Sequence, residues 1–441
     1  MTSLPDTLNR DILRLAVPAL GALVAEPLFL IVDSALVGHL GITPLAGLGI
    51  ASAVLQTIVG LMVFLAYSTT PAVARRFGAG DPSRAVSVGI DGMWLALGIG
   101  GVLALIGYVA TPFLVGLFGA TPLVSEQAET YLGISMWGLP AMLIVFAATG
   151  LLRGMQDTVT PLWIAGIGFA ANALLNWLFI YGVGWGIAGS AVGTVLAQWG
   201  MVAAYVVVIA RLARRHAASV RPHREGVRGS ARSGGWLFLR TVSLRVALLA
   251  TVAVATALGT GELAGWQVAF TIFSTAAFAL DALAIAAQAL IGKGLGAGDR
   301  PMVKRVLGRT LAWGAWFGLI VGGVIAAFSG VIGLLFTGDP QVAALVQPAL
   351  IVLAVAQPIC GVVFVLDGVL IGAGDARYLA LAGVLNLVPY VPALVIIGML
   401  QPHGAAGLAW LSVAFFGVYM LARLATLGWR VRGTTWMTIP A

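Results

Sequence analysis

Charged side chains are scarce in this sequence. Asp, Glu, Lys and Arg make up 9% of its 441 residues, about a third of the share that is usual in soluble domains. Apolar residues account for 60% and are spread along nearly the whole length, with a mean hydropathy of +1.02. No polar half is left that could form a soluble enzyme on a single anchor. The composition therefore predicts an integral membrane protein with many spans, whose main partner is the lipid bilayer.

Cysteine and histidine are equally sparse. The single cysteine, Cys360, lies in an apolar run, which excludes a disulfide framework and predicts a small buried core residue. The four histidines are scattered through predicted loops: His39, His216, His223 and His403. They form no cluster at catalytic or metal-binding spacing, and no Walker pattern is present. We therefore expect no enzyme, no resident metal, no cofactor and no self-contained ATP-driven pump.

Basic residues outnumber acidic ones, giving a net charge of +8 and a pI near 10.1. They lack the dense runs interleaved with aromatics that are typical of nucleic-acid-binding proteins, so no nucleic-acid partner is expected. They separate windows of about 20 apolar residues, which predict about twelve transmembrane helices. The approximate limits of these helices are 12–38, 44–72, 86–110, 126–152, 160–182, 187–211, 237–259, 264–292, 304–328, 341–372, 377–399 and 404–428.

Lys and Arg collect in alternate loops of this map. They occur near Arg10, Arg75, Arg153, Arg211 to Arg232, Lys293 to Arg309, Arg377 and Arg430. The loops near His39, Gly119, Gly184, Glu262, Gly338 and His403 carry none. Because Lys and Arg favour the cytoplasmic side, both termini are predicted to be cytoplasmic, in a multi-pass protein of the plasma membrane.

The second half of the sequence repeats motifs of the first at one constant offset. Phe77-Gly-Ala-Gly-Asp81 recurs as Leu295-Gly-Ala-Gly-Asp299, and Pro140 and Gly189 recur as Pro358 and Gly407. Six spans in each half is an even number, so the two halves form a parallel repeat. We predict an N-lobe at residues 1–210 (helices 1–6), a basic cytoplasmic linker at 211–235, and a C-lobe at 236–441 with helices 7–12 and a short cytoplasmic tail. The linker is expected to act as tether and orientation signal, with binding of anionic lipid headgroups as the alternative.

Five acidic residues fall inside apolar spans, more than one helical turn away from their ends: Glu26, Asp33, Asp91, Asp281 and Asp367. An ionised residue at a helix centre costs roughly 2.5 to 3.5 kcal/mol even on the lower scales, so each is a functional hypothesis. Asp91 and Asp367 lie near predicted cytoplasmic ends, where gating pairs or loop capping suffice. Asp281 is predicted to pair with Arg245, which also lies well inside a span.

Glu26 and Asp33 are two helical turns apart and share one face of the first span. Asp33 is the first candidate for binding and releasing a proton during a transport cycle, because a carboxylate in a partly dry cavity can do so. A merely structural, hydrogen-bonded carboxylate is the alternative, more so for Glu26. Pro18 and Pro27 each remove a backbone hydrogen bond and are predicted to let this helix bend.

Asn172 and Asn176 lie one turn apart and present a polar stripe, with Thr194 on the next span. With Asp33 and the Tyr131 phenol they are predicted to line a polar pocket in the first half. Hydrogen bonding between helices alone is the other interpretation.

The first span, Glu26-Pro-Leu-Phe-Leu-Ile-Val-Asp-Ser-Ala-Leu-Val-Gly-His-Leu-Gly41, resembles the DinF-like branch of the multidrug and toxic compound extrusion (MATE) transporters. The doubled Gly-Ala-Gly-Asp, the stretch Leu366-Asp-Gly-Val-Leu-Ile-Gly-Ala-Gly-Asp375 and residues 186–191 are similar to the same branch, and the resemblance covers essentially the whole chain. It implies a two-lobed, twelve-helix exporter that alternates between inward- and outward-open states and exchanges cationic, amphipathic compounds for protons or Na⁺.

Carried over by position, the resemblance implies that Asp33 is the coupling carboxylate and Pro18 the bend. It also makes Tyr131, Asn172 and Thr194 members of the N-lobe network. Asn176 departs from the family pattern, because many relatives carry an aspartate there. A Na⁺ site at Asp33, Asn172, Asn176 and Thr194 would then have a single anionic ligand, so protons are favoured as the coupling ion and Na⁺ is the alternative.

Two alternatives compete with the export of cations. A lipid-linked saccharide flippase of the same superfamily would need cationic side chains in its cavity to hold pyrophosphate, and only Arg245 is expected to be available inside the spans. An integral-membrane enzyme would need clustered catalytic residues near an interface, and the sequence shows none. The pseudo-symmetric lobes make a working monomer the simplest assembly.

Overall fold

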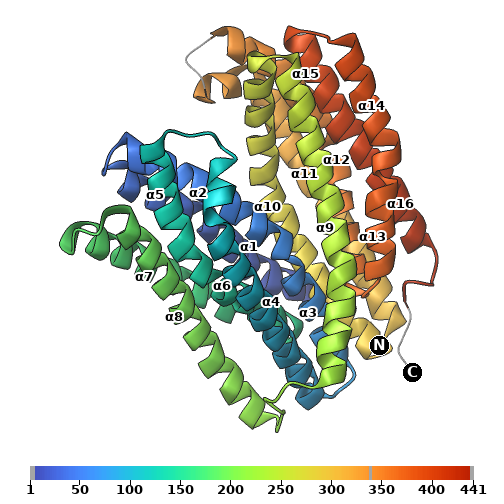
Figure 1. The fold of residues 1–441 in the computed structure, drawn as a ribbon. Helices are drawn as coiled ribbons and strands as arrows, with labels where there is room; N and C mark the ends of the chain where they lie inside the picture. The colour runs from blue at the N-terminus through green and yellow to red at the C-terminus, as the bar shows by residue number, and fades with distance from the viewer. Residues whose placement is uncertain (1–4, 337–339, 438–441) are drawn as a thin grey trace. The chain divides into compact units, whose positions relative to one another are not determined.

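The computed structural model describes residues 5–336 and 340–437, and the regular structure in these segments is helical (Figure 1). Within the described residues, twelve helices or combined helices are long and apolar enough to cross a membrane. The prediction of an all-α, twelve-span protein is therefore confirmed. Most spans extend beyond the predicted limits, because each apolar core continues into polar turns that remain helical.

The first half of the chain contains α1 to α8. Their bounds are α1 Pro5–Gly38, α2 Ile42–Met62, α3 Phe64–Gly78, α4 Pro82–Gly116, α5 Pro122–Ser135, α6 Leu139–Gly154, α7 Val159–Trp177 and α8 Gly186–Arg215. The second half contains α9 Arg224–Leu258, α10 Thr260–Gly296, α11 Arg300–Phe336, α12 Pro340–Gly372, α13 Ala376–Leu385, α14 Leu387–Leu400, α15 Gly404–Ser412 and α16 Met420–Arg432. A 3₁₀ turn at Met136–Gly138 joins α5 to α6, and π-helical segments at Leu178–Gly182 and Val413–Tyr419 follow α7 and α15.

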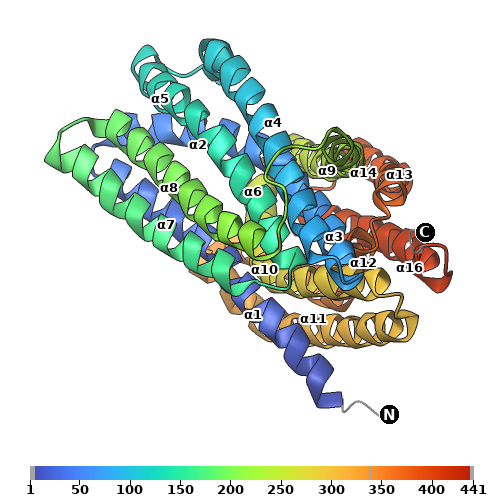
Figure 2. The same cartoon turned by 90° about the horizontal axis from the view of Figure 1, so that it is seen from below.

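The chain forms two compact units, residues 17–234 and residues 235–441 together with 1–16. In the first unit α7 packs along α8, as both views show (Figures 1 and 2). In the second unit α11 packs along α12. The basic segment 211–235, predicted to be a separate linker, belongs to the first unit up to Gly234. It is also mostly helical, because α8 continues to Arg215 and α9 begins at Arg224.

The short connection between α8 and α9 is fixed along one face of α4. Four hydrogen bonds hold it, joining Ser83 to Ala217, Ser87 to Ser219, Trp94 to Val220 and Asp91 to His223. Asp91 is buried, and its Oδ1 accepts from the His223 backbone N–H at 2.8 Å, just before α9 begins. A carboxylate at the N-terminus of a helix satisfies an otherwise unpaired N–H group. Asp91 thus caps α9, and these bonds explain why the segment joins the first unit.

Glycine allows α11 and α12 to approach closely. Gly314, Gly318 and Gly322 recur at every fourth position of α11. A Cβ on Gly318 would lie 2.7 Å from the Pro358 Cα, and a Cβ on Gly361 would collide with the Gly314 backbone. Small residues at this spacing let membrane helices pack backbone to backbone. This packing accounts for part of the high glycine content. Cys360, next to Gly361, is buried in this interface region, as the sequence predicts.

The repeated Gly-Ala-Gly-Asp motif forms a helix stop followed by a helix start. Gly80 and Gly298 adopt φ values of +79° and +70°, which glycine tolerates best. Asp81 then accepts from the Arg84 N–H at 2.9 Å, and Asp299 accepts in the same way from the Met302 N–H. These aspartates are N-caps of α4 and α11. The motif therefore builds matching turns in the two halves.

The constant offset that relates Phe77 to Leu295 survives in the three-dimensional structure. Gly41 and Gly259 are related by it, and both have positive φ and precede α2 and α10. Gly186 and Gly404 likewise have positive φ and begin α8 and α15. Positions related by this offset are called equivalent below, because they can be compared directly between the two halves.

Candidate functional site

Asp33 of α1 lies in a polar pocket inside the unit of residues 17–234. Asp33 is only 4% exposed. Oδ1 accepts hydrogen bonds from Asn176 Nδ2 and from Ser190 Oγ, each at 2.7 Å, and Oδ2 accepts from the Tyr131 hydroxyl at 3.2 Å. Side chains from α1, α5, α7 and α8 therefore meet at one carboxylate.

The two asparagines of α7 extend this network away from Asp33. Asn176 Nδ2 also donates to Asn172 Oδ1 at 3.1 Å, and Asn172 Nδ2 donates to Thr194 Oγ1 at 2.9 Å. Both asparagines and Thr194 are buried. The structure thus brings together five residues that the sequence proposed for one pocket, Asp33, Tyr131, Asn172, Asn176 and Thr194.

The partners of the Asp33 carboxylate are neutral. The hydroxyls of Tyr131 and Ser190 and the amide of Asn176 supply hydrogen-bond donors, and no cationic side chain contacts Asp33 among the described residues. Neutral donors stabilise a buried carboxylate only in part, because removal from water is costly unless a charge is paired.

A cation in this pocket would have one carboxylate as its anionic ligand, with neutral hydroxyl and amide oxygens as the others. Asn176 presents its NH₂ group to Asp33, and its Oδ1 is buried without a hydrogen-bond donor in the described part of the chain. Cations such as Na⁺ need several oxygen ligands, with anionic ligands to offset their charge. Within residues 5–336 and 340–437, no three His, Cys, Asp or Glu side chains form a group that could hold a metal.

Ser190 is the member of the network that sequence reasoning missed. It lies on α8, one turn before Thr194, and is fully buried. A serine inside the small-residue stretch 186–191 is typical of close helix packing, which masks a polar role. Its position one helical turn from Thr194 is the signal that could have identified it.

The other candidates on α1 lie outside this network. Glu26 is exposed and makes no hydrogen bond with the described residues. Pro18 and Pro27 both lie inside α1, which continues through them as one helix. Their role as bending points stays a prediction.

The ion pair predicted for the second half involves residues of α9 and α10. Arg245 lies on an exposed face of α9, and Asp281 is half-buried in α10. Their pairing stays a prediction. Two further arginines, Arg240 and Arg423, are buried in α9 and α16. The expectation that Arg245 is the only arginine available inside the spans is therefore wrong.

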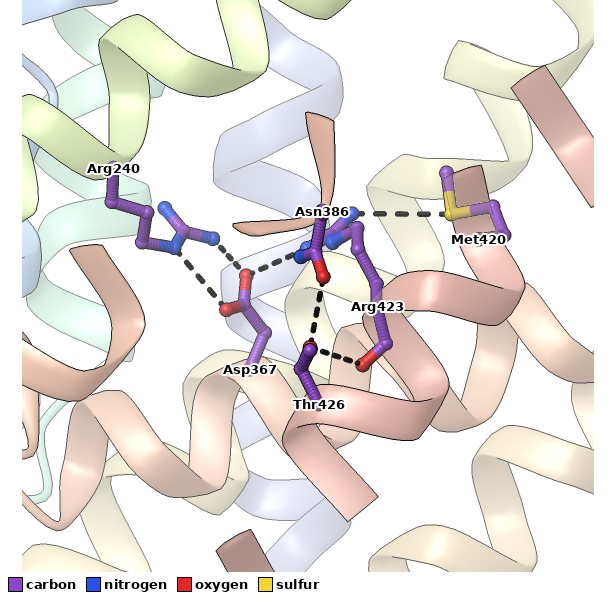
Figure 3. Close-up of polar contacts among 6 residues, drawn as sticks. All are labelled: Arg240, Asp367, Asn386, Met420, Arg423 and Thr426. Carbon is purple, nitrogen blue, oxygen red and sulfur yellow. Dashed lines mark hydrogen bonds and ion pairs between the residues drawn. The ribbon is translucent and has the colours of Figure 1, made fainter. Parts of the chain in front are cut away.

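Arg240 and Arg423 converge on Asp367 of α12, as Figure 3 shows. Arg240 Nε donates to Asp367 Oδ1 at 3.2 Å, and a terminal nitrogen of the same guanidinium bonds Oδ2. Arg423 donates to Oδ2 at 3.1 Å. The sequence pattern places Asp367 and Arg423 near a cytoplasmic end and does not pair them. The pairing depends on three helices that are far apart in the chain.

Comparison with known proteins agrees with this architecture. The family model described as MatE matches residues 18–178 and 238–399. The chain is 29% identical to "Protein DETOXIFICATION 44, chloroplastic" of Arabidopsis thaliana, with 96% of this chain and 82% of that protein covered. It is 26% identical to "DNA damage-inducible protein F" of Escherichia coli, with 97% and 94% covered.

Among solved structures, the bent form of the Vibrio cholerae MATE transporter VcmN has the same fold. Its TM-score is 0.87 at 20% identity, with 97% of this chain and 98% of that chain covered. The family match spans most of the chain and falls on both halves of the repeat. This multi-pass membrane protein therefore belongs to the MatE family, the multidrug and toxic compound extrusion transporters.

Proposed function

We propose that this transporter exports cationic, amphipathic compounds across the plasma membrane in exchange for protons, working as a monomer by alternating access. Asp33 carries the coupling proton. The protonated carboxyl donates a hydrogen bond, whereas the ionised form only accepts, so each proton transfer changes which partners the pocket can satisfy. Such a change biases α1 between two arrangements, and Pro18 and Pro27 supply weak points in its backbone.

One observation carries this proposal: a buried carboxylate whose contacts are three neutral donors. A structural carboxylate inside a membrane is normally neutralised by a cation, as Asp367 is by its two arginines. Asp33 has no such partner among the described residues, so a proton or a cationic substrate is the natural source of neutralisation.

The same pocket favours protons over Na⁺. Asp33 supplies the single carboxylate of the pocket, and the Asn176 NH₂ group donates to that carboxylate. A Na⁺ ion bound here would have one anionic ligand, with neutral hydroxyl and amide oxygens as the others. A proton needs Asp33 alone.

The test uses purified protein in liposomes loaded with a fluorescent organic cation. Efflux is measured under an imposed pH gradient and, separately, under a Na⁺ gradient. We expect efflux to follow the pH gradient and to fall in Asp33→Asn to the rate of protein-free liposomes. Asp91→Asn is the matched control, because it replaces a second buried carboxylate of the same unit with the same isostere and is expected to keep wild-type efflux.

The contrary outcomes are distinct. Efflux driven by Na⁺ alone would show that the oxygens of the pocket form a cation site. Efflux retained in Asp33→Asn would remove this carboxylate from the coupling step. A protein that moves the cation under neither gradient would not be an exporter of this class, and the flippase hypothesis would then lead.

A further inference from the structure

The ion cluster of the second unit lies beside a small cavity. The cavity has a volume of about 10 Å³ and is lined by Arg240, Asp367, Asn386, Tyr419 and Arg423 together with three leucines, an alanine and a glycine. A space of this size holds one water-sized guest. The three charged lining residues carry two guanidinium groups and one carboxylate, so the charge of the lining is positive.

Some hydrogen-bond donors around this cavity have no strong acceptor. The Tyr419 hydroxyl is buried and has no hydrogen-bond partner within the described ranges of the chain. Asn386 uses its amide oxygen to accept from the Thr426 hydroxyl at 3.0 Å, which leaves its NH₂ group for the cavity (Figure 3). One terminal nitrogen of Arg423 donates to Asp367, and the other donates to the Met420 sulfur at 3.9 Å.

These groups favour a ligand that accepts hydrogen bonds. Guanidinium and amide NH₂ groups only donate, and a thioether sulfur is a weak acceptor that satisfies a guanidinium poorly. The Tyr419 hydroxyl is buried without a partner in the described part of the chain, which is costly, and hydrogen bonds to a charged partner are the stronger ones. A small anion would satisfy the tyrosine, the amide and the guanidinium together and would offset the positive lining.

We propose that this cavity binds one small monovalent anion of the size of chloride, held by Arg423, Tyr419 and Asn386. The carboxylate of a small organic anion has the same chemistry, and the competition experiment below distinguishes it from chloride. This site lies in the second unit and shares no residue with the Asp33 pocket, so it is independent of the proposed function.

The equivalent positions of the first half carry a neutral hydrogen bond in place of the ion pair. The positions equivalent to Asp367 and Arg423 are Thr149 and Tyr205, whose hydroxyls hydrogen-bond at 2.8 Å. This pair is neutral and self-sufficient. At these equivalent positions the charged groups are in the second half, and one anion per chain is expected.

The experiment measures anion binding directly, without transport. Full-length protein in nanodiscs is titrated with radiolabelled chloride by equilibrium dialysis, and its thermal unfolding is followed as chloride replaces gluconate at constant ionic strength. We expect one chloride per chain and a midpoint of unfolding that rises and saturates with chloride, because a ligand that binds only the folded state stabilises it. Bromide is expected to compete, and formate and acetate are expected not to.

Three variants sharpen the result. Tyr419→Phe removes one donor and is expected to weaken chloride binding about tenfold, the effect of one hydrogen bond to a charged group. Asn386→Asp keeps the acceptor for Thr426 and places a carboxylate in the cavity, so chloride binding should be lost even though the variant is folded. Tyr390→Phe is the matched control, because its hydroxyl bonds Thr251 and it does not line the cavity.

Absence of chloride binding to the wild type would mean that a water fills the cavity, and the proposal would be wrong. Equal weakening in Tyr419→Phe and Tyr390→Phe would also overturn it, by placing the anion elsewhere. Displacement of chloride by formate or acetate would assign the site to the carboxylate of an organic anion instead. A failure of Asp33-dependent efflux would leave all three outcomes unchanged.

Discussion

The two halves of the chain bury opposite kinds of polar contact at equivalent positions. Asp33 is equivalent to Thr251, and Asn172 is equivalent to Tyr390. In the first half a carboxylate organises amides and hydroxyls, whereas in the second half Thr251 and Tyr390 hydrogen-bond to each other within an aromatic cluster. A charged site in one half is thus a neutral pair in the other.

The relation is reversed where α12 meets α16. Asp367 and Arg423 form an ion pair there, and their counterparts Thr149 and Tyr205 form a neutral hydrogen bond between α6 and α8. The repeat therefore keeps the places where helices exchange side-chain contacts and changes the chemistry of each contact. In the proposed function, the first half handles the coupling proton, whereas an ion cluster joins α9, α12 and α16 in the second half.

The largest expected effect comes from breaking the ion cluster. Asp367→Thr alone leaves two buried guanidinium groups without their carboxylate, and unpaired buried charges typically cost about 3–5 kcal/mol. We expect a loss of unfolding free energy of that size, measured by denaturation in mixed micelles. Thr149→Val removes the neutral counterpart at the equivalent position and is expected to cost about 1 kcal/mol.

The double variant Asp367→Thr with Arg423→Tyr imports the neutral pair of the first half into the second. It removes one of the two guanidinium groups that lose the Asp367 carboxylate, so it is expected to be more stable than Asp367→Thr alone. Equal stability of the single and double variants would show that the two halves do not share this contact in an interchangeable form.

The matching turns of the two halves provide a second, smaller test. Gly80 has a positive φ and open space around its Cβ position, so Gly80→Ala pays only for backbone conformation, about 1–2 kcal/mol. Gly101 of α4 also has open space but lies in regular helix, where alanine is preferred to glycine. We expect Gly101→Ala to be neutral or stabilising. Thermal unfolding of the two variants in the same detergent distinguishes the cost of backbone strain from the effect of the added methyl group.

Much of this architecture was predictable from local sequence patterns. The twelve spans follow from apolar windows, and the two-fold repeat follows from motifs that recur at one offset. Asn172, Asn176 and Asp33 were predicted to share a pocket because intramembrane polar residues are costly and helical spacing places them on defined faces. These inferences use only hydropathy, periodicity and the cost of burying charge.

The remaining contacts depend on tertiary structure. Arg240 and Arg423 lie near the ends of apolar runs, where an arginine is normally assigned to the adjacent loop, and only the packing of α9, α12 and α16 shows that both are buried. Ser190 is hidden in a run of small residues. The basic composition of the linker predicts a tether between the lobes and gives no sign that the linker backbone at residues 217–223 is hydrogen-bonded along α4.

The smallest expected effect separates the two neutral pairs. Tyr205→Phe leaves the Thr149 hydroxyl without its described partner and is expected to cost about 1 kcal/mol of unfolding free energy. Tyr390→Phe is expected to cost about 0.5 kcal/mol, because Thr251 also donates to the Ala247 carbonyl at 2.7 Å and stays satisfied. Denaturation of both variants under identical conditions measures the difference. A larger loss of unfolding free energy for Tyr390→Phe would mean that the aromatic cluster depends on this hydroxyl. The Thr251–Tyr390 pair would then stabilise the second half, beyond occupying the position that Asp33 has in the first half.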